Sequence, residues 1–345
     1  MRVTFKKYIL HFKEPGGTSR GVLHDKETYF LMLEDEGKYA FGECNLFKGL
    51  SADDREGYEK KLTEVCTRIP TEKENILSSL SEWPSIQFGV ETLLRDWKSG
   101  CRRIIFPEAF SNNSFSVPVN GLIWMGTESE MKKRIDGKLS SGYKCIKLKI
   151  GAIDFEKELA LVKYIREKGG ESLEIRLDAN GGFSSEEALK KIEKLYPYNI
   201  HYIEQPVRAG QWAKMAQLIK ESPVPIALDE ELIGIFKTDD KIRLMDTLKP
   251  SILILKPALI GGFASCNFYR NLLKPRNGYC VVTSALESNI GLNAIAQYIA
   301  TFHPQIPQGI GTGQLFNNNI PAPYHLSPGT LHYDPGGAWN FKSVV

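Results

Sequence analysis

Three acidic residues and three lysines follow short runs of strand-forming residues in the middle of the chain. They are Asp178, Glu204, Asp229, Lys147, Lys149 and Lys256. Carboxylates that meet at one place repel each other unless a cation lies among them, and oxygen ligands suit Mg2+ or Mn2+. A lysine beside such a cation and a second ammonium group has a lowered pKa and can act as a base. These residues predict proton abstraction next to a carboxylate, with the metal stabilising the resulting negative charge.

Each charged group also has a simpler interpretation. Any one acid could form a salt bridge with a neighbouring lysine, and Tyr143–Gly151 could be an edge strand with a solvated basic face. Three acids at the same position of successive strands favour a shared cation instead. Glu230 and Glu231 compete with Asp229 as a ligand. The strand period favours Asp229, and alternation along the strand predicts that Glu230 points to the other face.

The spacing of the strand ends predicts a parallel barrel. Eight strand-like runs end at positions 25 to 29 residues apart: Asn120, Lys149, Asp178, Glu204, Asp229, Lys256, Ser284 and Gly311. The segments between them carry apolar residues at helical spacing. A repeated β/α unit with one period is typical of a closed parallel barrel, whose functional groups gather at the C-terminal ends of the strands.

The chain divides into three predicted parts. Residues 1–112 combine strand-like and helix-like segments without the barrel period, which predicts an α+β domain. Residues 113–315 hold the barrel, and the boundary is expected in Ser111–Ser114. Residues 316–345, which contain several prolines early on, are expected to pack back on the first domain.

Composition excludes several classes of protein. The chain has 345 residues, a formal net charge of +3, 42% hydrophobic and 25% charged residues. This balance is typical of a globular protein and does not indicate nucleic acid or an anionic membrane as partner. No apolar run approaches the roughly 18 residues of a membrane span. The six cysteines lack metal-type spacing and are expected to be reduced thiols, which with the absence of a signal-like N-terminus predicts a cytoplasmic protein.

Five motifs in order resemble those of the enolase superfamily, muconate-lactonising subgroup. They are Lys147–Lys149, Asp178–Asn180, Ile203–Pro206, Leu228–Glu230 and Leu255–Pro257. The resemblance covers nearly the whole chain and implies an α/β fold, a modified TIM barrel (β/α)7β with an N-terminal α+β capping domain. It also implies that the three acids bind Mg2+, possibly replaced by Mn2+, and that Lys149 and Lys256 are the acid/base pair. Lys147 would support Lys149 electrostatically.

Within that subgroup, four further stretches resemble the o-succinylbenzoate synthase family. They are Thr18–Leu23, Gly42–Ser51, Thr283–Ser288 and Gly311–Phe316. The resemblance implies a small-molecule carboxylate substrate and a cap that closes over it. The implied substrate-binding residues are Arg20, Asn180, Thr283, Ser284 and Gly311. The first stretch could also be an ordinary surface turn, and Ser284 and Ser288 could simply terminate a strand. Cys44–Lys48 departs from the proline-containing version expected there.

The implied reaction is loss of water from 2-succinyl-6-hydroxy-2,4-cyclohexadiene-1-carboxylate in menaquinone biosynthesis. A racemase on the same scaffold is the first alternative, because lysines on two faces can exchange a proton from either side. Dipeptide epimerases carry Asp-x-Asp at the end of the eighth strand, whereas this chain has Gly311–Gly313. An N-succinylamino acid racemase remains an alternative because its substrate shares the succinyl group. A metal-holding barrel without turnover is the second alternative.

Overall fold

The computed structural model describes residues 1–18 and 21–344. Its first sheet is antiparallel, with β1 (Arg2–Thr18), β2 (Gly21–Asp35) and β3 (Lys38–Cys44) in that order. The pairing of β1 with β2 continues to Thr18 and Gly21, so the start of the stretch Thr18–Leu23 belongs to these strands. Arg20 lies outside the described residues.

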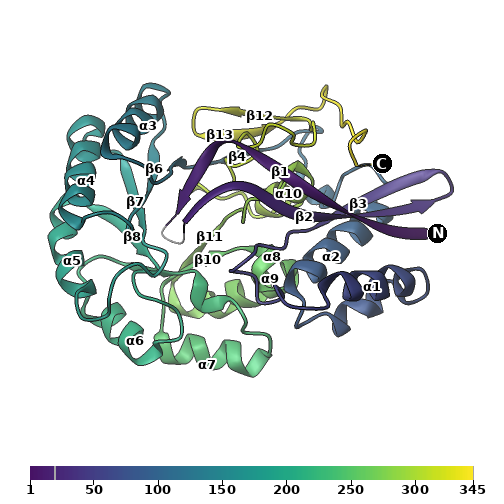
Figure 1. Ribbon diagram of the computed structural model, residues 1–345, viewed down its shortest axis with the longest axis horizontal. Helices are drawn as coiled ribbons and strands as arrows, with labels where there is room; N and C mark the ends of the chain where they lie inside the picture. Colours follow the sequence, from purple (N-terminus) through teal and green to yellow (C-terminus); the bar gives the residue numbers. More distant parts are fainter. Residues whose placement is uncertain (19–20, 345) are drawn as a thin grey trace.

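Helices α1 (Tyr58–Glu72) and α2 (Pro84–Lys98), with the 3-10 turn η1 (Lys73–Ser79) between them, pack beside this sheet (Figure 1). Two glycines allow α2 to approach β3 very closely. A Cβ atom on Gly42 would lie 2.1 Å from the carbonyl oxygen of Gly89. The absence of side chains at both positions therefore fixes how the helix seats on the sheet.

Seven parallel strands curl around a second core, in the order β11-β10-β9-β8-β7-β6-β5 (Figure 1). They are β5 (Gly121–Ile123), β6 (Cys145–Lys149), β7 (Glu174–Asp178), β8 (Ile200–Glu204), β9 (Ile226–Leu228), β10 (Ile252–Leu255) and β11 (Tyr279–Val282). Helices follow the strands: α3 (Glu128–Ser140), α4 (Phe155–Gly169), α5 (Ala188–Leu195), α6 (Trp212–Glu221), α7 (Thr238–Leu248), α8 (Pro257–Ile260), α9 (Gly262–Leu273) and α10 (Asn289–Ala300). Shorter 3-10 turns are η2 (Pro107–Ala109), η3 (Tyr196–Tyr198), η4 (Glu230–Leu232) and η5 (Lys274–Arg276).

The segment at Gln308 and Gly309 closes the curled sheet. Gln308 bridges Val119, and Gly309 bridges Thr283, both in parallel orientation. Together with the seven strands this makes the predicted (β/α)7β barrel, an α/β fold. The outward faces are apolar, as Ile146 and Leu148 show by being fully buried under the helices.

The first barrel strand differs from the prediction. β5 begins at Gly121, after the predicted end at Asn120, and its Leu122 and Ile123 pair with Lys147 and Leu148. The strand-like residues before it form β4 (Ser116–Pro118), which belongs to another sheet. Local pattern identifies a strand but not its partner, so the predicted register was wrong.

The C-terminal tail contacts both parts of the chain. Strands β12 (Tyr324–Ser327) and β13 (Thr330–Tyr333) form an antiparallel sheet with β4. Phe316 bridges Phe12 of β1, and the ring of Phe341 stacks on Phe41 of β3 at 4.0 Å. The domain boundaries at 112 and 315 stay predictions. No helix in the described ranges is long and apolar enough to cross a membrane.

Candidate active site

The three predicted acids lie at one rim of the barrel. Lys149 pairs in register with Asp178, and Asp178 with Glu204, so β6, β7 and β8 end side by side. Asp229 follows β9 directly. The exposed fractions of Asp178, Glu204 and Asp229 are 1%, 0% and 2%. The parallel ladder therefore gathers three carboxylates in a buried space where charge interactions are strong.

Two lysines of β6 approach these acids from the adjacent strand. Lys147 Nζ lies 2.5 Å from Glu204 Oε2 and 3.1 Å from Asp178 Oδ2. Lys149 Nζ also lies 3.1 Å from Asp178 Oδ2. Because the two side chains share one strand face, Asp178 contacts both ammonium groups, whereas Glu204 contacts that of Lys147.

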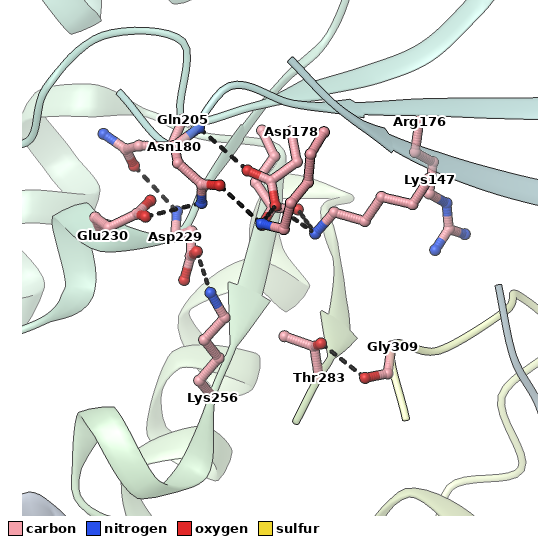
Figure 2. Close-up of polar contacts among 12 residues, drawn as sticks. Lys147, Arg176, Asp178, Asn180, Gln205, Asp229, Glu230, Lys256, Thr283 and Gly309 are labelled. Atoms are coloured by element: carbon pink, nitrogen blue, oxygen red, sulfur yellow. Dashed lines mark hydrogen bonds and ion pairs between the residues drawn. The ribbon is translucent and has the colours of Figure 1, made fainter. Parts of the chain in front are cut away.

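Lys256 reaches the acids from the other side of the barrel. It follows β10, four strands from β6 in a ring of eight, and forms an ion pair with Asp229 (Figure 2). Burial lowers the pKa of Lys256, but the negative charges of Asp229 and Glu230 outweigh it and raise that pKa overall. The ion pair with Asp229 therefore favours the ammonium form of Lys256.

The three acids respond differently to their surroundings. Burial opposes ionisation of Asp178, but Lys147 and Lys149 outweigh it and lower the pKa of Asp178. Burial, together with the charge of Asp178, raises the pKa of Glu204 to about 8. Burial, with Glu230 adding to it, raises the pKa of Asp229 to about 6. The neighbouring lysines thus outweigh the effect of burial on the pKa of Asp178. They do not outweigh it for Glu204 and Asp229.

The residues present suit a divalent cation. Within the described ranges, no group of three or more His, Cys, Asp or Glu is arranged as a ready ligand set, since lysines contact the carboxylates instead. However, Glu204 Oε1 is buried without a hydrogen-bond partner. A fully buried carboxylate oxygen left unpaired costs free energy, and a hard cation that accepts oxygen ligands would remove that cost.

Asn180 connects the lysine side of the site to Glu230. Lys149 Nζ donates to Asn180 Oδ1 at 2.7 Å. Asn180 Nδ2 in turn donates to Glu230 Oε1 at 3.1 Å, and Figure 2 shows these two side chains facing each other. The prediction that Glu230 points to the opposite face was wrong. β9 ends at Leu228 and the chain turns into η4, so strand alternation no longer applies at Glu230.

A cavity of about 460 Å³ opens above these groups. Lys149 and Lys256 both line it, together with Asp178. Phe47 and Leu50, which follow the first sheet, line its other side. A small organic molecule in this cavity would contact both lysines and would be covered by the N-terminal part of the chain.

Comparisons with known proteins identify the family. A model of the family described as "Enolase C-terminal domain-like" matches residues 130–333. The chain belongs to the enolase superfamily. It is 40% identical to an o-succinylbenzoate synthase of Desulfotalea psychrophila, and the alignment covers 96% of this chain and 98% of the relative.

Solved structures agree with this assignment to the enolase superfamily. The crystal structure of MenC from Desulfotalea psychrophila matches with a TM-score of 0.84 and 37% identity, over 96% of this chain and 99% of that chain. A dipeptide epimerase from Enterococcus faecalis, solved with Mg and the dipeptide L-Leu-L-Tyr, matches with a TM-score of 0.84. At 19% identity, over 98% of this chain and 97% of the epimerase, that second likeness shows the fold alone.

The predicted substrate-binding residues are distributed around the cavity of this enolase-superfamily chain. Asn180, Thr283, Ser284 and Gly311 all line it. The Thr283 hydroxyl donates to the carbonyl oxygen of Gly309 at 2.8 Å, so it is turned toward the barrel wall (Figure 2). Arg20, the fifth of the predicted substrate-binding residues, lies outside the described residues.

Ser284 and Ser288 belong to a buried polar network. The Ser284 hydroxyl donates to Glu287 Oε2 at 2.5 Å. The Ser288 hydroxyl donates to Glu43 Oε2 at 2.6 Å and also accepts from the backbone N–H of Ile290, which caps α10. Ser288 therefore joins β3 to the barrel, and its hydroxyl is engaged within the protein.

Asn45, in the segment that departs from the family pattern, completes this network. Its Nδ2 donates to the carbonyl oxygen of Ala285 at 2.9 Å and to Glu287 Oε1 at 2.8 Å. Its Oδ1 accepts from the buried Lys26 ammonium. The cap segment before Phe47 is thus tied to the loop after β11 by side chains far apart in sequence.

Sequence reasoning missed two residues that contact the predicted site residues. Lys149 Nζ lies 5.7 Å from the centre of the Trp124 ring, which continues from β5 at the level of Lys149. Gln205 Oε1 accepts from the backbone N–H groups of Asp229 and Glu231 and so positions the β9 end. The correct register of the first strand would have identified Trp124, and the Ile203–Pro206 motif contains Gln205.

Proposed function

We propose that this enolase-superfamily protein is an o-succinylbenzoate synthase, a carbon–oxygen lyase acting on 2-succinyl-6-hydroxy-2,4-cyclohexadiene-1-carboxylate. The observation that carries the proposal is the pair Lys149 and Lys256 on opposite walls of one cavity, above three buried carboxylates. The relative of the same name, 40% identical over nearly the full length of both chains, supports this substrate.

Lys149 is the proposed base and acid. As a free amine it takes the proton from the ring carbon that bears the carboxylate, and this breaks the C–H bond. The electron pair left on that carbon forms the new ring double bond as the neighbouring C–O bond breaks. The ammonium of Lys149 then gives its proton to the departing hydroxide, so water leaves and the amine is restored. Both transfers occur on the same face.

Lys256 acts as a fixed positive charge in this proposal. Its pKa is raised by Asp229 and Glu230 against the effect of burial, which keeps the ammonium protonated. A cation on the face opposite Lys149 stabilises negative charge that develops on the substrate and can lie over its ring. Lys147, paired with Glu204 and Asp178, adds positive charge behind Lys149.

Asp178, Glu204 and Asp229 are the proposed ligands of Mg2+, or of Mn2+ in its place. When bound, the cation would supply positive charge beside the substrate carboxylate and so stabilise the negative charge formed on deprotonation. Asn180 holds the Lys149 side chain toward this charge through its 2.7 Å hydrogen bond. Arg20, Thr283, Ser284 and Gly311 stay proposed substrate contacts, and menaquinone biosynthesis and a cytoplasmic location belong to the same proposal.

N-succinylamino acid racemisation is the second candidate. The position of Lys149 and Lys256 on opposite walls favours it, because one lysine could remove an α-proton and the other could return one to the opposite face. This chemistry needs Lys256 as a free amine in one direction, whereas Asp229 and Glu230 stabilise its ammonium form. Elimination does not require Lys256 to lose its proton, and we therefore prefer it to racemisation.

The test is an absorbance assay for dehydration of the cyclohexadiene carboxylate, with Mg2+ and then with EDTA. Metal-dependent turnover that disappears in Lys149→Ala supports the proposal. No turnover, with deuterium entering the α-carbon of N-succinylamino acids from heavy water, would assign the protein to the racemases. Inactivity in both assays would reject both reactions.

A further inference from the structure

The cavity has a wall on the side of the barrel away from the three acids. Asp178, Glu204 and Asp229 end or follow β7, β8 and β9. In the ring of eight, the segment at Gln308 and Gly309 stands opposite β8, with β11 on one side of it and β5 on the other. A ligand whose carboxylate lies at the acids therefore extends its other end toward this wall.

The register around the barrel places Asn120 in this wall at the level of Lys256. Lys256 and Thr283 follow β10 and β11 at equal positions in their ladder. Thr283 bridges Gly309, and the residue before Gly309 bridges the residue before Asn120, both in parallel orientation. Going from β10 to β5 around the closed barrel, Asn120 thus occupies the same rung as Lys256.

The side chain of Asn120 points into the barrel. Alternation along β5 gives Asn120 the same face as Leu122 and Trp124, and all three line the cavity. Ile123, on the other face, belongs to the apolar core under the helices. Counted from β6 instead, Trp124 is the residue at the level of Lys149, because the strands of a closed barrel are staggered. The inner face of β5 therefore lines the cavity over several rungs.

The predicted substrate contacts in this wall have no free side-chain donor. The Thr283 hydroxyl donates to the carbonyl oxygen of Gly309 at 2.8 Å. The Ser284 hydroxyl donates to Glu287 Oε2 at 2.5 Å. Gly311 has no side chain. A polar ligand group that reaches this wall needs a donor from another residue.

The carboxamide of Asn120 is such a donor. Asn120 is 6% exposed, and its Oδ1 is buried without a hydrogen bond. Its Nδ2 also forms no hydrogen bond within residues 1–18 and 21–344, and it is open to the cavity. The hydroxyl of Thr312, in the same cavity wall, is likewise buried without a partner. Buried polar groups without partners cost free energy, which a polar ligand group would recover.

The charges around Asn120 favour an anionic ligand group. Glu14 and Asp178 are the acids among the described residues that line the cavity, and they come from β1 and β7. No described carboxylate in the wall of β11, the closing segment and β5 would therefore repel an anion. The ammonium group of Lys256 lies on the same rung, and an amide N–H donates more strongly to a carboxylate than to a neutral oxygen.

We propose that Asn120 donates a hydrogen bond from Nδ2 to the distal carboxylate of the succinyl chain and so determines specificity for succinyl-bearing substrates. The inference rests on the proposed function, which supplies a substrate with two carboxylates. With the ring carboxylate beside the acids and the ring between Lys149 and Lys256, the succinyl chain points to the wall that contains Asn120. Asn120 contacts no reacting atom, so its contribution is to binding and not to the proton transfers.

The first experiment compares Asn120→Leu with the wild-type protein in the dehydration assay. Leucine has nearly the same size and shape but no hydrogen-bonding group. Loss of a hydrogen bond to a carboxylate predicts a KM raised about 10- to 100-fold, with kcat changed less than about threefold. Asn271→Leu, at an exposed asparagine of α9 outside the cavity wall, is the matched control and should leave both constants unchanged. An unchanged KM in Asn120→Leu would overturn the inference.

A second measurement separates recognition of the carboxylate from a general loss of structure. Calorimetry in the presence of Mg2+ compares the product o-succinylbenzoate with 2-butanoylbenzoate, which lacks the distal carboxylate. Wild type should bind o-succinylbenzoate at least about tenfold more tightly, and Asn120→Leu should lose most of this preference. Equal binding of the two ligands by wild type, or an equal loss for both in Asn120→Leu, would show that Asn120 does not recognise the carboxylate.

Asn120→Asp keeps the side chain polar and decides the question if Asn120→Leu fails to fold. Its carboxylate would lie against that of the ligand. The Kd of o-succinylbenzoate should therefore rise at least about tenfold more than that of 2-butanoylbenzoate. Equal changes in the two dissociation constants would reject the contact.

The two proposals can fail separately. Wild-type turnover with no effect of Asn120→Leu rejects the role of Asn120 and leaves the synthase. Absence of turnover rejects the synthase, and binding of N-succinylamino acids and N-butanoylamino acids is then compared in wild type and Asn120→Leu. A selective loss of N-succinylamino acid binding would leave Asn120 as the succinyl contact of a racemase. Without such a loss both proposals are rejected.

Discussion

Lys149 of β6 and Asp178 of β7 are direct neighbours in the parallel ladder, and Lys149 Nζ lies 3.1 Å from Asp178 Oδ2. The proposed base is thus held by the same carboxylate that is proposed to bind the metal. Asn180, two residues after Asp178, holds the same ammonium at 2.7 Å. In the proposed mechanism, one strand end would therefore position both the proton-transfer group and the ligand of the cation.

Replacing Lys149 by alanine should abolish dehydration while the protein stays folded. Loss of a positioned acid/base group is expected to lower kcat by about 100-fold to 10,000-fold. Circular dichroism and thermal melting should change little, because Lys149 is partly exposed to the cavity. Lys144→Ala, an exposed lysine just before β6, is the control and should keep full activity. Equal activity of the two variants would exclude Lys149 as the base.

Mg2+ should stabilise the folded protein in the absence of substrate. A ligand that binds only the folded state adds about 2.7 kcal/mol at a concentration 100 times its Kd, and thermal melting against Mg2+ concentration measures this. Glu204→Gln should weaken the response. Glu193→Gln, an exposed acid on α5, should leave it unchanged. An identical melting response in wild type and Glu204→Gln would argue against Glu204 as a ligand.

Gly42→Ala should destabilise the N-terminal part of the chain. The added methyl would lie 2.1 Å from the carbonyl oxygen of Gly89, so α2 must move away from β3. Overpacking of this kind costs about 1–3 kcal/mol, measured by urea unfolding. Gly137→Ala in α3, where a Cβ atom meets nothing within 4 Å, is the contrasting change and should stabilise slightly. A more stable Gly42→Ala variant would contradict the close packing of α2 on β3.

Titration of Asp53 should make the free energy of unfolding depend on pH in the mildly acidic range. Its Oδ2 accepts from the Ser85 N–H and hydroxyl, yet burial raises its pKa to about 6. The folded state therefore holds a proton that the unfolded state releases near pH 4, so this group's contribution falls as the pH rises from about 4 to about 6. The loss is about 3 kcal/mol by the pKa difference.

The Asp53→Asn variant isolates this effect from other titrating acids. Because the amide does not ionise, the unfolding free energy of the variant minus that of wild type should increase between pH 4 and pH 6. Urea unfolding at several pH values measures the difference. A difference that stays constant across that range would show that Asp53 titrates normally in the folded protein.

The sequence alone determined which residues meet at the strand ends. Lys149, Asp178, Glu204, Asp229 and Lys256 could be placed together because strand alternation and the β/α period are local properties, repeated with little variation. A parallel barrel then brings all strand ends to one rim, whatever the details of its helices. The predicted fold was confirmed for the same reason.

The tertiary structure decided what local patterns leave open. The first strand took its register from pairing with β6, which put Trp124 and not Asn120 at the level of Lys149. Glu230 turned into the site because β9 ends before it. Asn120 reached the level of Lys256 because the segment at Gln308 closes the barrel beside it. These features arise from contacts between segments far apart in sequence, and the side-chain period of a single segment carries no information about its partner.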